Sequence, residues 1–213
     1  MSMNTDINSV LEAMRKNAWI ELQEKVNKCT KCPLHRTRNN TVFGEGPTEN
    51  CRCVIIGEAP GVDEDREGRP FMGRAGTLLN EILCESGIPR ESVYIMNVLK
   101  CRPPSDIPGK QNRPPNAEEI SACKDYLEAQ LLLLHPDIIV TMGNTPTRFI
   151  LETEQGITSI RGRWFDKRGI KIFTMFHPSY LLHGRNYPNS PDRINTFADG
   201  KRLKAALDWL NTH

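Results

Sequence analysis

Four of the seven cysteines have a spacing that can provide a metal site. Cys29 and Cys32 form a C-x-x-C pair in a segment with little periodicity, Cys101 directly follows an expected strand, and Cys123 lies in an expected helix. Thiolates at such positions bind zinc or iron–sulfur clusters, although redox motifs share the C-x-x-C spacing. A metal or cluster site and a set of unrelated buried thiols therefore both remain open.

The other cysteines are expected to be buried structural residues. Cys51 and Cys53 stand at the start of an expected strand, and Cys84 lies on a Leu-rich helix as a small core residue. The number of cysteines is odd, and the N-terminal segment does not resemble a signal peptide. Both observations argue against a disulfide framework.

Three polar residues stand where expected strands end. Glu58 follows the apolar run VIIG within GEAPG, Asn97 closes VYIMN, and His177 follows the last strand in HPSY. Ligands of parallel α/β sheets bind at the carboxyl ends of strands, which favours a site there. Taken singly, Asn97 is nearly as compatible with a structural role, and a lone His before Pro is more often structural than catalytic. The GEAPG turn lacks both the G-x-G-x-x-G spacing and a P-loop lysine, so it does not predict a phosphate site.

Strand-like and helix-like segments alternate along the chain. Apolar spacing and stop signals predict helices at 7–27, 74–86 and 200–209 and a capped helix from Asn116, with Glu119 completing a capping box. Strands are expected at 52–56, 93–99 and 138–141, followed by a hairpin at 163–165 and 170–175. This order predicts a mostly parallel sheet that is covered on both faces.

Composition limits the class of protein further. The 213 residues are 38% hydrophobic and 25% charged, which fits one globular domain, and no apolar run approaches the length of a membrane span. A cytoplasmic location without membrane contact is expected. The net charge is only +2, but residues 161–213 hold ten Lys or Arg against four Asp, which is typical of either an anion-facing surface or a solvated helix face.

Three motifs together resemble one enzyme family. GEAPGVDEDREGRPFMGRAG, NVLKC and HPSYLL are similar to the family 4, thermophile-type iron–sulfur uracil-DNA glycosylases, and the resemblance extends from Cys29 to the final helix. It implies a three-layer α/β/α sandwich with a central four-stranded, mostly parallel sheet. The chain would form a single domain, 1–213, with an N-terminal helix and a cluster-binding loop region. Four cysteines would hold a [4Fe–4S] cluster: Cys29, Cys32, Cys101 and Cys123. A prokaryotic source is also expected.

The resemblance also implies a reaction and assigns residues to it. Such enzymes flip uracil out of DNA and hydrolyse its N-glycosidic bond, leaving an abasic site. Phe71 would stack on the base, Asn97 would read the uracil edge, and His177 would donate a hydrogen bond to uracil O2 as charge accumulates there. Leu181 or Leu182 would fill the gap in the DNA, although either is equally compatible with burial in the core.

The first motif departs from a base-activated mechanism. Ala59 stands where the best-known branch of the superfamily has a water-positioning Asp, so the rate is assigned mainly to stabilisation of the leaving group. Gly57, Glu58 and Ala59 would line the uracil site, Glu58 having a water-positioning or a structural role. Glu64 would help to exclude the thymine methyl group, because Gly61 is too small to do so.

Two alternatives follow from these departures. Ala59 favours a non-catalytic iron–sulfur module that binds DNA, and a third hypothesis is a glycosylase for a wider range of deaminated bases. The expected partner is uracil-containing DNA, single- or double-stranded, bound by a monomer. After HPSYLL, His183-Gly184-Arg185 replaces the immediate Arg that is common in the family, which leaves the DNA contacts of this segment open.

Overall fold

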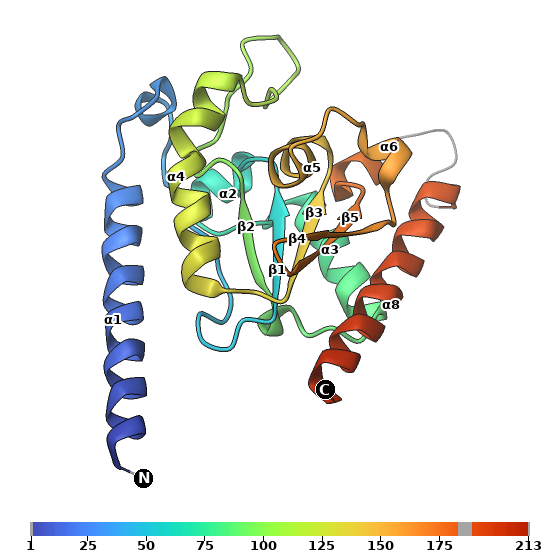
Figure 1. Cartoon of the computed structure of the whole chain (residues 1–213). Helices are drawn as coiled ribbons and strands as arrows, with labels where there is room; N and C mark the ends of the chain where they lie inside the picture. The colour runs from blue at the N-terminus through green and yellow to red at the C-terminus, as the bar shows by residue number, and fades with distance from the viewer. Residues whose placement is uncertain (1, 183–188, 213) are drawn as a thin grey trace.

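A five-stranded sheet forms the centre of the molecule, as described by a computed structural model for residues 2–182 and 189–212. The strand order is β2-β1-β3-β5-β4, and neighbouring strands are parallel except for β4, which is antiparallel to β5. Figure 1 shows the sheet between helical layers. The strands are β1 (Cys53–Gly57), β2 (Tyr94–Asn97), β3 (Ile138–Met142), β4 (Trp164–Lys167) and β5 (Ile170–Met175).

The α/β/α prediction is confirmed, and the predicted number of strands is corrected from four to five. The additional strand, β4, is the first arm of the hairpin that the sequence predicts. It pairs along the whole of its length with β5, and the rings of Trp164 and Phe173 stack with centroids 4.4 Å apart. This aromatic pair holds the edge strand in the sheet.

Helices cover both faces of the sheet. They are α1 (Ser2–Asn27), α2 (Val62–Glu67), α3 (Arg74–Glu85), α4 (Ala117–Leu134), α5 (Asn144–Leu151), α6 (Ile157–Ile160), α7 (Pro178–Leu181) and α8 (Pro191–Thr212), with short 3₁₀ helices η1 (Pro33–Arg36) and η2 (Arg90–Ser92). Among these described segments, every helix is too short or too polar to span a lipid bilayer.

Alternating strand residues divide the core between the two faces. Ile55 and Val140 pack with side chains of α3 and α8 on one face, whereas Val54 and Ile139 pack with α4 and α5 on the other. Helix α1 lies outside α4, as both views show, and its last turns contribute to a small third cluster that contains Val26. The period of two along each strand therefore produces the two-sided burial that the apolar runs predict.

A local signal explains where α4 begins. The Asn116 side chain accepts from the Glu119 N–H at 2.8 Å and the Glu119 carboxylate accepts from the Asn116 N–H at 3.0 Å, so the predicted capping box is confirmed.

The prediction that the last helix begins at residue 200 is wrong, because α8 starts at Pro191. Its first turns bury Thr196 and Asp199, which have no apolar periodicity to reveal a helix.

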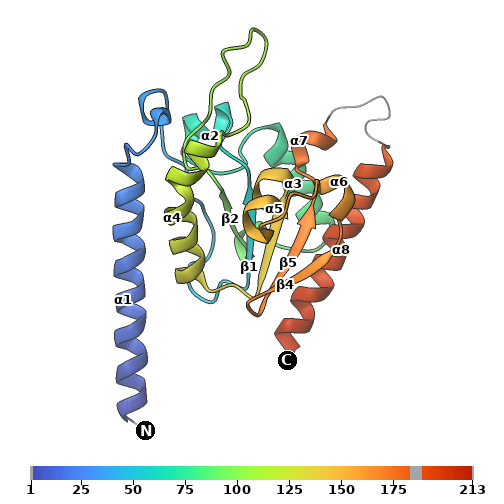
Figure 2. The same cartoon turned by 45° about the horizontal axis from the view of Figure 1, so that its top comes forward.

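The ends of the parallel strands define one edge of the molecule. Gly57 is in register with Asn97, and Met142 is in register with Met175, so the segments after these strands meet there. Figure 2 shows the long loop before α4 extending beyond this edge. Any site built from the strand-end motifs must lie here.

Candidate active site

A single cleft at the carboxyl edge of the sheet collects the strand-end residues. Its lining includes residues from the GEAPG turn, the end of β2, the segment after β3 and the start of α7. The predicted site residues among its walls are Glu58, Ala59, Glu64, Phe71, Asn97, His177 and Leu182. The fold therefore brings together side chains that are far apart in the sequence.

Gly57, which the sequence predicts to line the site, is not among the described lining residues of the cleft, but it lets two of these side chains meet. A Cβ atom at Gly57 would lie 2.3 Å from Asn97 Oδ1 and 2.7 Å from Phe71 Cζ, which no ordinary contact permits. Asn97 and Phe71 are 2% and 5% exposed, so both side chains are held by the surrounding protein. An amide beside an aromatic ring can bind a planar ring by hydrogen bonds to its edge and by stacking on its face.

The imidazole of His177 is held in one tautomer. Its Nδ1 atom lies 3.1 Å from the Ser179 backbone nitrogen and 2.7 Å from the Ser179 hydroxyl. A backbone N–H can only donate, so Nδ1 is the acceptor and the proton of the neutral ring is on Nε2. Desolvation lowers the pKa of His177 to about 4, against an opposing effect of Glu64. At neutral pH this residue is therefore a neutral hydrogen-bond donor.

His177 also lies beside the aromatic wall of the cleft. The centroids of its ring and the Phe71 ring are 5.6 Å apart, with an interplanar angle of 30°. The two rings and the Asn97 amide thus belong to one constellation, which supports the grouping that the motifs predict.

Glu58 is fixed by a residue that the sequence did not single out. The hydroxyl of Thr145, at the start of α5, donates to Glu58 Oε2 at 2.5 Å. Ala59, the next residue, lines the cleft and also packs against the cluster that contains Leu99 and Cys101. Thr145 follows the M-G-N turn after β3, and this position at the carboxyl edge was the signal that could have identified it.

Glu64 organises backbone rather than presenting a free carboxylate. Its Oε2 atom accepts from the N–H of Gly61 at 2.9 Å, and its Oε1 atom accepts from the N–H groups of Met72 and Gly73 at 2.8 and 3.1 Å. The side chain is 9% exposed. Its carboxylate therefore shapes the loop that carries Phe71, and the expected contact with a base substituent at C5 is not needed to explain its position.

The two candidate wedge residues have different surroundings. Leu181 is 2% exposed and belongs to the core cluster next to α3, so the structure argues against Leu181 as the wedge. Leu182 lines the cleft and packs only partly against that core. Leu182 thus stays the wedge prediction, whereas the segment His183-Gly184-Arg185 lies outside the described residues.

The cysteines of the C-x-x-C pair share a cavity with Cys101 and Cys123. Cys29 and Cys32 lie between α1 and η1, and the packing of α1 on α4 brings them towards Cys123. Among the described residues, no three Cys, His, Asp or Glu side chains already have a metal-binding arrangement. Burial raises the pKa of Cys101 to about 11, although Arg38 opposes this.

Two basic side chains around this cavity fit an anionic metal–thiolate group. The Lys100 side chain is 1% exposed, lines the cavity and donates to the Asn97 carbonyl at 2.8 Å. Desolvation lowers the pKa of Lys100 to about 7, and negative charge on Cys123 opposes this shift. The Arg38 guanidinium contacts Cys101 Sγ at 3.3 Å. Buried cations require nearby negative charge, and thiolates bound to a cluster would supply it. The donor set is therefore compatible with a cluster of four thiolates.

The long loop before α4 is a further wall that the sequence did not assign to the site. Gln111, Asn112 and Arg113 line the cleft. Arg102 holds this part of the loop, because it donates to Asn112 Oδ1 and to the Gln111 carbonyl, both at 2.7 Å. The Pro- and Gly-rich composition of this segment predicts a loop, but it contains no periodic pattern that would indicate where the loop lies relative to the cleft.

The fold and the cleft define a class: α/β proteins with a cleft of polar and aromatic side chains at the carboxyl edge of a mostly parallel sheet. Comparison with known proteins narrows that class. Residues 43–200 match the family described as the Uracil DNA glycosylase superfamily. The chain belongs to this family.

Three relatives carry the same name, type-4 uracil-DNA glycosylase. The protein from Thermotoga maritima is 50% identical over 78% of this chain and 83% of its own. The protein from Archaeoglobus fulgidus is 40% identical over 89% of this chain and 98% of its own. The protein from Sulfurisphaera tokodaii is 41% identical over 78% of this chain and 76% of its own. The predicted family resemblance is confirmed.

Proposed function

We propose that this protein is a monofunctional uracil-DNA glycosylase that flips uracil out of DNA and hydrolyses the N-glycosidic bond, leaving an abasic site for base excision repair. The convergence of Asn97, Phe71 and His177 on one cleft is the observation that supports this function most directly. The names of the relatives support the same reaction.

Asn97 is proposed to select uracil by the hydrogen-bond pattern of the base. Its Oδ1 atom accepts from uracil N3–H and its Nδ2 atom donates to O4, whereas cytosine presents the reverse pattern at these positions. Burial of Asn97 strengthens this choice, because a wrong base would leave the amide unpaired in a site closed to water. Phe71 supplies the stacking surface.

His177 is proposed to stabilise the departing base. As the bond from N1 to the sugar breaks, the sugar acquires positive charge and the base leaves as an anion. A hydrogen bond from Nε2–H to uracil O2 becomes stronger as that charge develops. Such donors lower the activation free energy by roughly 2.7–4 kcal/mol. The contacts from Ser179 to Nδ1 support this tautomer.

Water activation is assigned a minor part. Ala59 has no side chain that accepts a proton, and Glu58 is the carboxylate next to it. Because the Thr145 hydroxyl engages Glu58 Oε2, the carboxylate is oriented and its Oε1 atom is proposed to position the attacking water. The reaction then depends mainly on leaving-group stabilisation.

A [4Fe–4S] cluster bound by Cys29, Cys32, Cys101 and Cys123 is proposed as the cofactor. The shared cavity and the surrounding cations support this ligand set. When bound, the cluster supplies a structural cross-link between the C-x-x-C segment, the end of β2 and α4, and it takes no part in the bond cleavage. We further propose that the enzyme acts as a monomer on single- or double-stranded DNA in a prokaryotic cytoplasm.

A uracil-containing oligonucleotide tests the function. Incubation with the protein and then hot alkali should break the strand at the uracil position, and an otherwise identical thymine oligonucleotide should remain intact. The rival is a non-catalytic DNA-binding module, which Ala59 favours. Binding without alkali-labile sites, on both single- and double-stranded substrates, would support that rival and refute the glycosylase.

A further inference from the structure

Phe71 has a backbone conformation that its surroundings must enforce. Its φ angle is 54°, in the left-handed region, where a bulky residue loses about 1 kcal/mol or more. Its carbonyl oxygen lies so close to Gly76 that a Cβ there would come within 1.8 Å of it. The ring position therefore depends on contacts that hold the peptide groups on either side.

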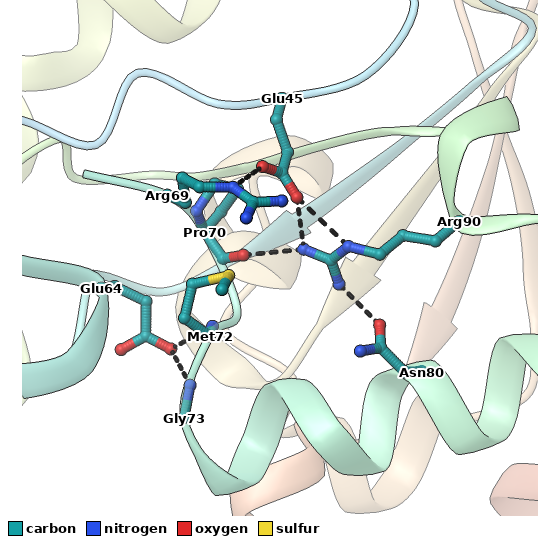
Figure 3. A network of polar contacts seen from close by, with 8 residues as sticks. All are labelled: Glu45, Glu64, Arg69, Pro70, Met72, Gly73, Asn80 and Arg90. Atoms are coloured by element: carbon teal, nitrogen blue, oxygen red, sulfur yellow. Dashed lines mark hydrogen bonds and ion pairs between the residues drawn. The ribbon is translucent and has the colours of Figure 1, made fainter. Parts of the chain in front are cut away.

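Two charged side chains hold these peptide groups (Figure 3). Before Phe71, the Pro70 carbonyl accepts a hydrogen bond from Arg90 Nη2 at 2.8 Å. After Phe71, the Met72 N–H donates to Glu64 Oε1 at 2.8 Å. Glu64 lies in α2, just before the loop in the sequence, but Arg90 comes from η2, which follows α3 in the chain.

Arg90 is itself fixed by two acceptors. Its Nε and Nη2 atoms donate to Glu45 Oε1 at 3.2 and 2.7 Å, and its Nη1 atom donates to Asn80 Oδ1 at 2.8 Å. The Arg90 and Glu45 side chains are 22% and 25% exposed, so solvent screens this pair less than a surface pair. Burial alone would raise the pKa of Glu45, but hydrogen bonds from Arg69 and Arg90 lower it overall. Glu45 is therefore a carboxylate at neutral pH.

Glu45 connects this arrangement to the strand that carries Asn97. Its backbone N–H donates to the Ile95 carbonyl at 3.0 Å, and its carbonyl accepts from the Ile95 N–H at 2.8 Å. Ile95 precedes Asn97 by two residues in β2. A continuous set of contacts thus runs from the Asn97 strand through Glu45 and Arg90 to the loop of Phe71.

We propose that Arg90 and Glu45 are positioning residues for uracil, because they set the Phe71 ring relative to the Asn97 amide. This inference rests on the proposed function and deepens it. Neither side chain is among the cleft-lining residues, so both act through Phe71 rather than on the base. The fork of Arg90 matters as well as its charge, since a lysine ammonium cannot reach Glu45, Asn80 and Pro70 in the same fixed directions.

Inhibition by free uracil measures the pocket without DNA contacts, and Ki is independent of the fraction of protein that is folded. We expect Arg90→Met to raise the Ki of uracil about tenfold. This is the affinity lost when one well-placed aromatic contact, here that of Phe71 with the base, is removed. Arg90→Lys should give a smaller increase, and Glu45→Gln an increase between wild type and Arg90→Met. Arg52→Met is the matched control, because Arg52 binds the Asp137 carboxylate at 2.8 Å and neither residue lines the cleft or belongs to the loop of Phe71. Its Ki should equal that of the wild type.

A double-mutant cycle separates positioning from general stability. In a Phe71→Ala background, Arg90→Met should change the Ki by less than twofold, because the ring on which Arg90 acts is gone. An unchanged Ki for Arg90→Met in the wild-type background would overturn the proposal, as would an equal effect in both backgrounds. If Arg90→Met does not fold, the same comparison with Glu45→Gln decides. Lack of uracil excision by the wild-type protein would instead refute the proposed function.

Discussion

The Nδ1 atom of His177, a residue that lines the cleft, accepts from the backbone N–H of Ser179 at 3.1 Å, which leaves Nε2 as the protonated nitrogen. This donor is proposed to stabilise uracil as an anionic leaving group. We expect His177→Ala to lower the single-turnover rate about 10²- to 10³-fold while the Kd for uracil DNA changes much less. Rapid-quench kinetics and fluorescence anisotropy measure the two quantities. A variant that loses only DNA affinity would contradict the leaving-group role.

The low pKa of His177 predicts an unusual pH profile. The pKa is lowered to about 4, so the ring stays neutral from pH 8 to pH 5 and the single-turnover rate should show no titration near the ordinary histidine value of about 6.5. In the same range the unfolded chain binds more protons, so the free energy of unfolding should fall as pH drops from about 6.5 towards 4. Urea unfolding at several pH values checks the second effect.

His177→Gln is the matched control for both measurements, since glutamine does not titrate. It should show a smaller loss of stability between pH 6.5 and pH 4 than the wild type. A wild-type rate that titrates near pH 6.5, with the titration absent in His177→Gln, would mean that the charged imidazole takes part in the reaction.

Asn97 should control which base is excised. Asn97→Asp replaces the amide donor with a second acceptor, so its carboxylate can accept from the exocyclic amine of cytosine but not donate to uracil O4. We expect uracil excision to fall at least about 100-fold and the ratio of cytosine to uracil excision to rise. Oligonucleotides that differ in one base measure this ratio. Equal activity on every base before and after the substitution would refute the assigned role.

The sequence could predict those features that local patterns encode. Apolar runs located the strands, the Asn116 and Glu119 pair located the start of α4, and the resemblance carried by the long GEAPG motif assigned Phe71 to the site. Each of these signals lies within about twenty residues of chain. The predicted α/β/α order followed from them, because strand and helix periods alternate.

Other features depend on contacts between distant segments and left no local pattern. Glu45 and Arg90 are 45 positions apart, and the carboxylate of Glu64 reaches amides eight and nine positions away. Polar residues buried by tertiary contacts also conceal periodicity: Asp199 is 2% exposed and paired with Arg161, so the first turns of α8 were not expected. In these cases the tertiary fold determines which residues form hydrogen bonds and ion pairs with one another.

Gly57 is predicted to be essential for the shape of the cleft. In Gly57→Ala the new methyl group would lie 2.3 Å from Asn97 Oδ1, so either Asn97 or Phe71 must move. We expect kcat/KM to fall at least about tenfold and the free energy of unfolding to fall by about 1–3 kcal/mol. Gly169→Ala is the control, because its φ angle of 82° is strained while no atom lies within 4 Å of the new Cβ. It should lose stability but keep its activity, and equal activity in both variants would contradict the steric argument.

Removal of one proposed cluster ligand should separate the cofactor from the chemistry. Protein purified without oxygen is expected to be brown and to hold about four irons, whereas Cys101→Ser should lose iron, visible absorbance and thermal stability. Cys84→Ser is the control, because Cys84 lies outside the shared cavity and is exposed, so the prediction that it is a buried core residue is wrong. Loss of the cluster frees the segment that follows Asn97, so uracil excision should fall together with iron content across partly loaded samples. Zinc in place of iron in the anaerobic preparation would refute the proposed cofactor, and full activity of iron-free Cys101→Ser would refute its structural role.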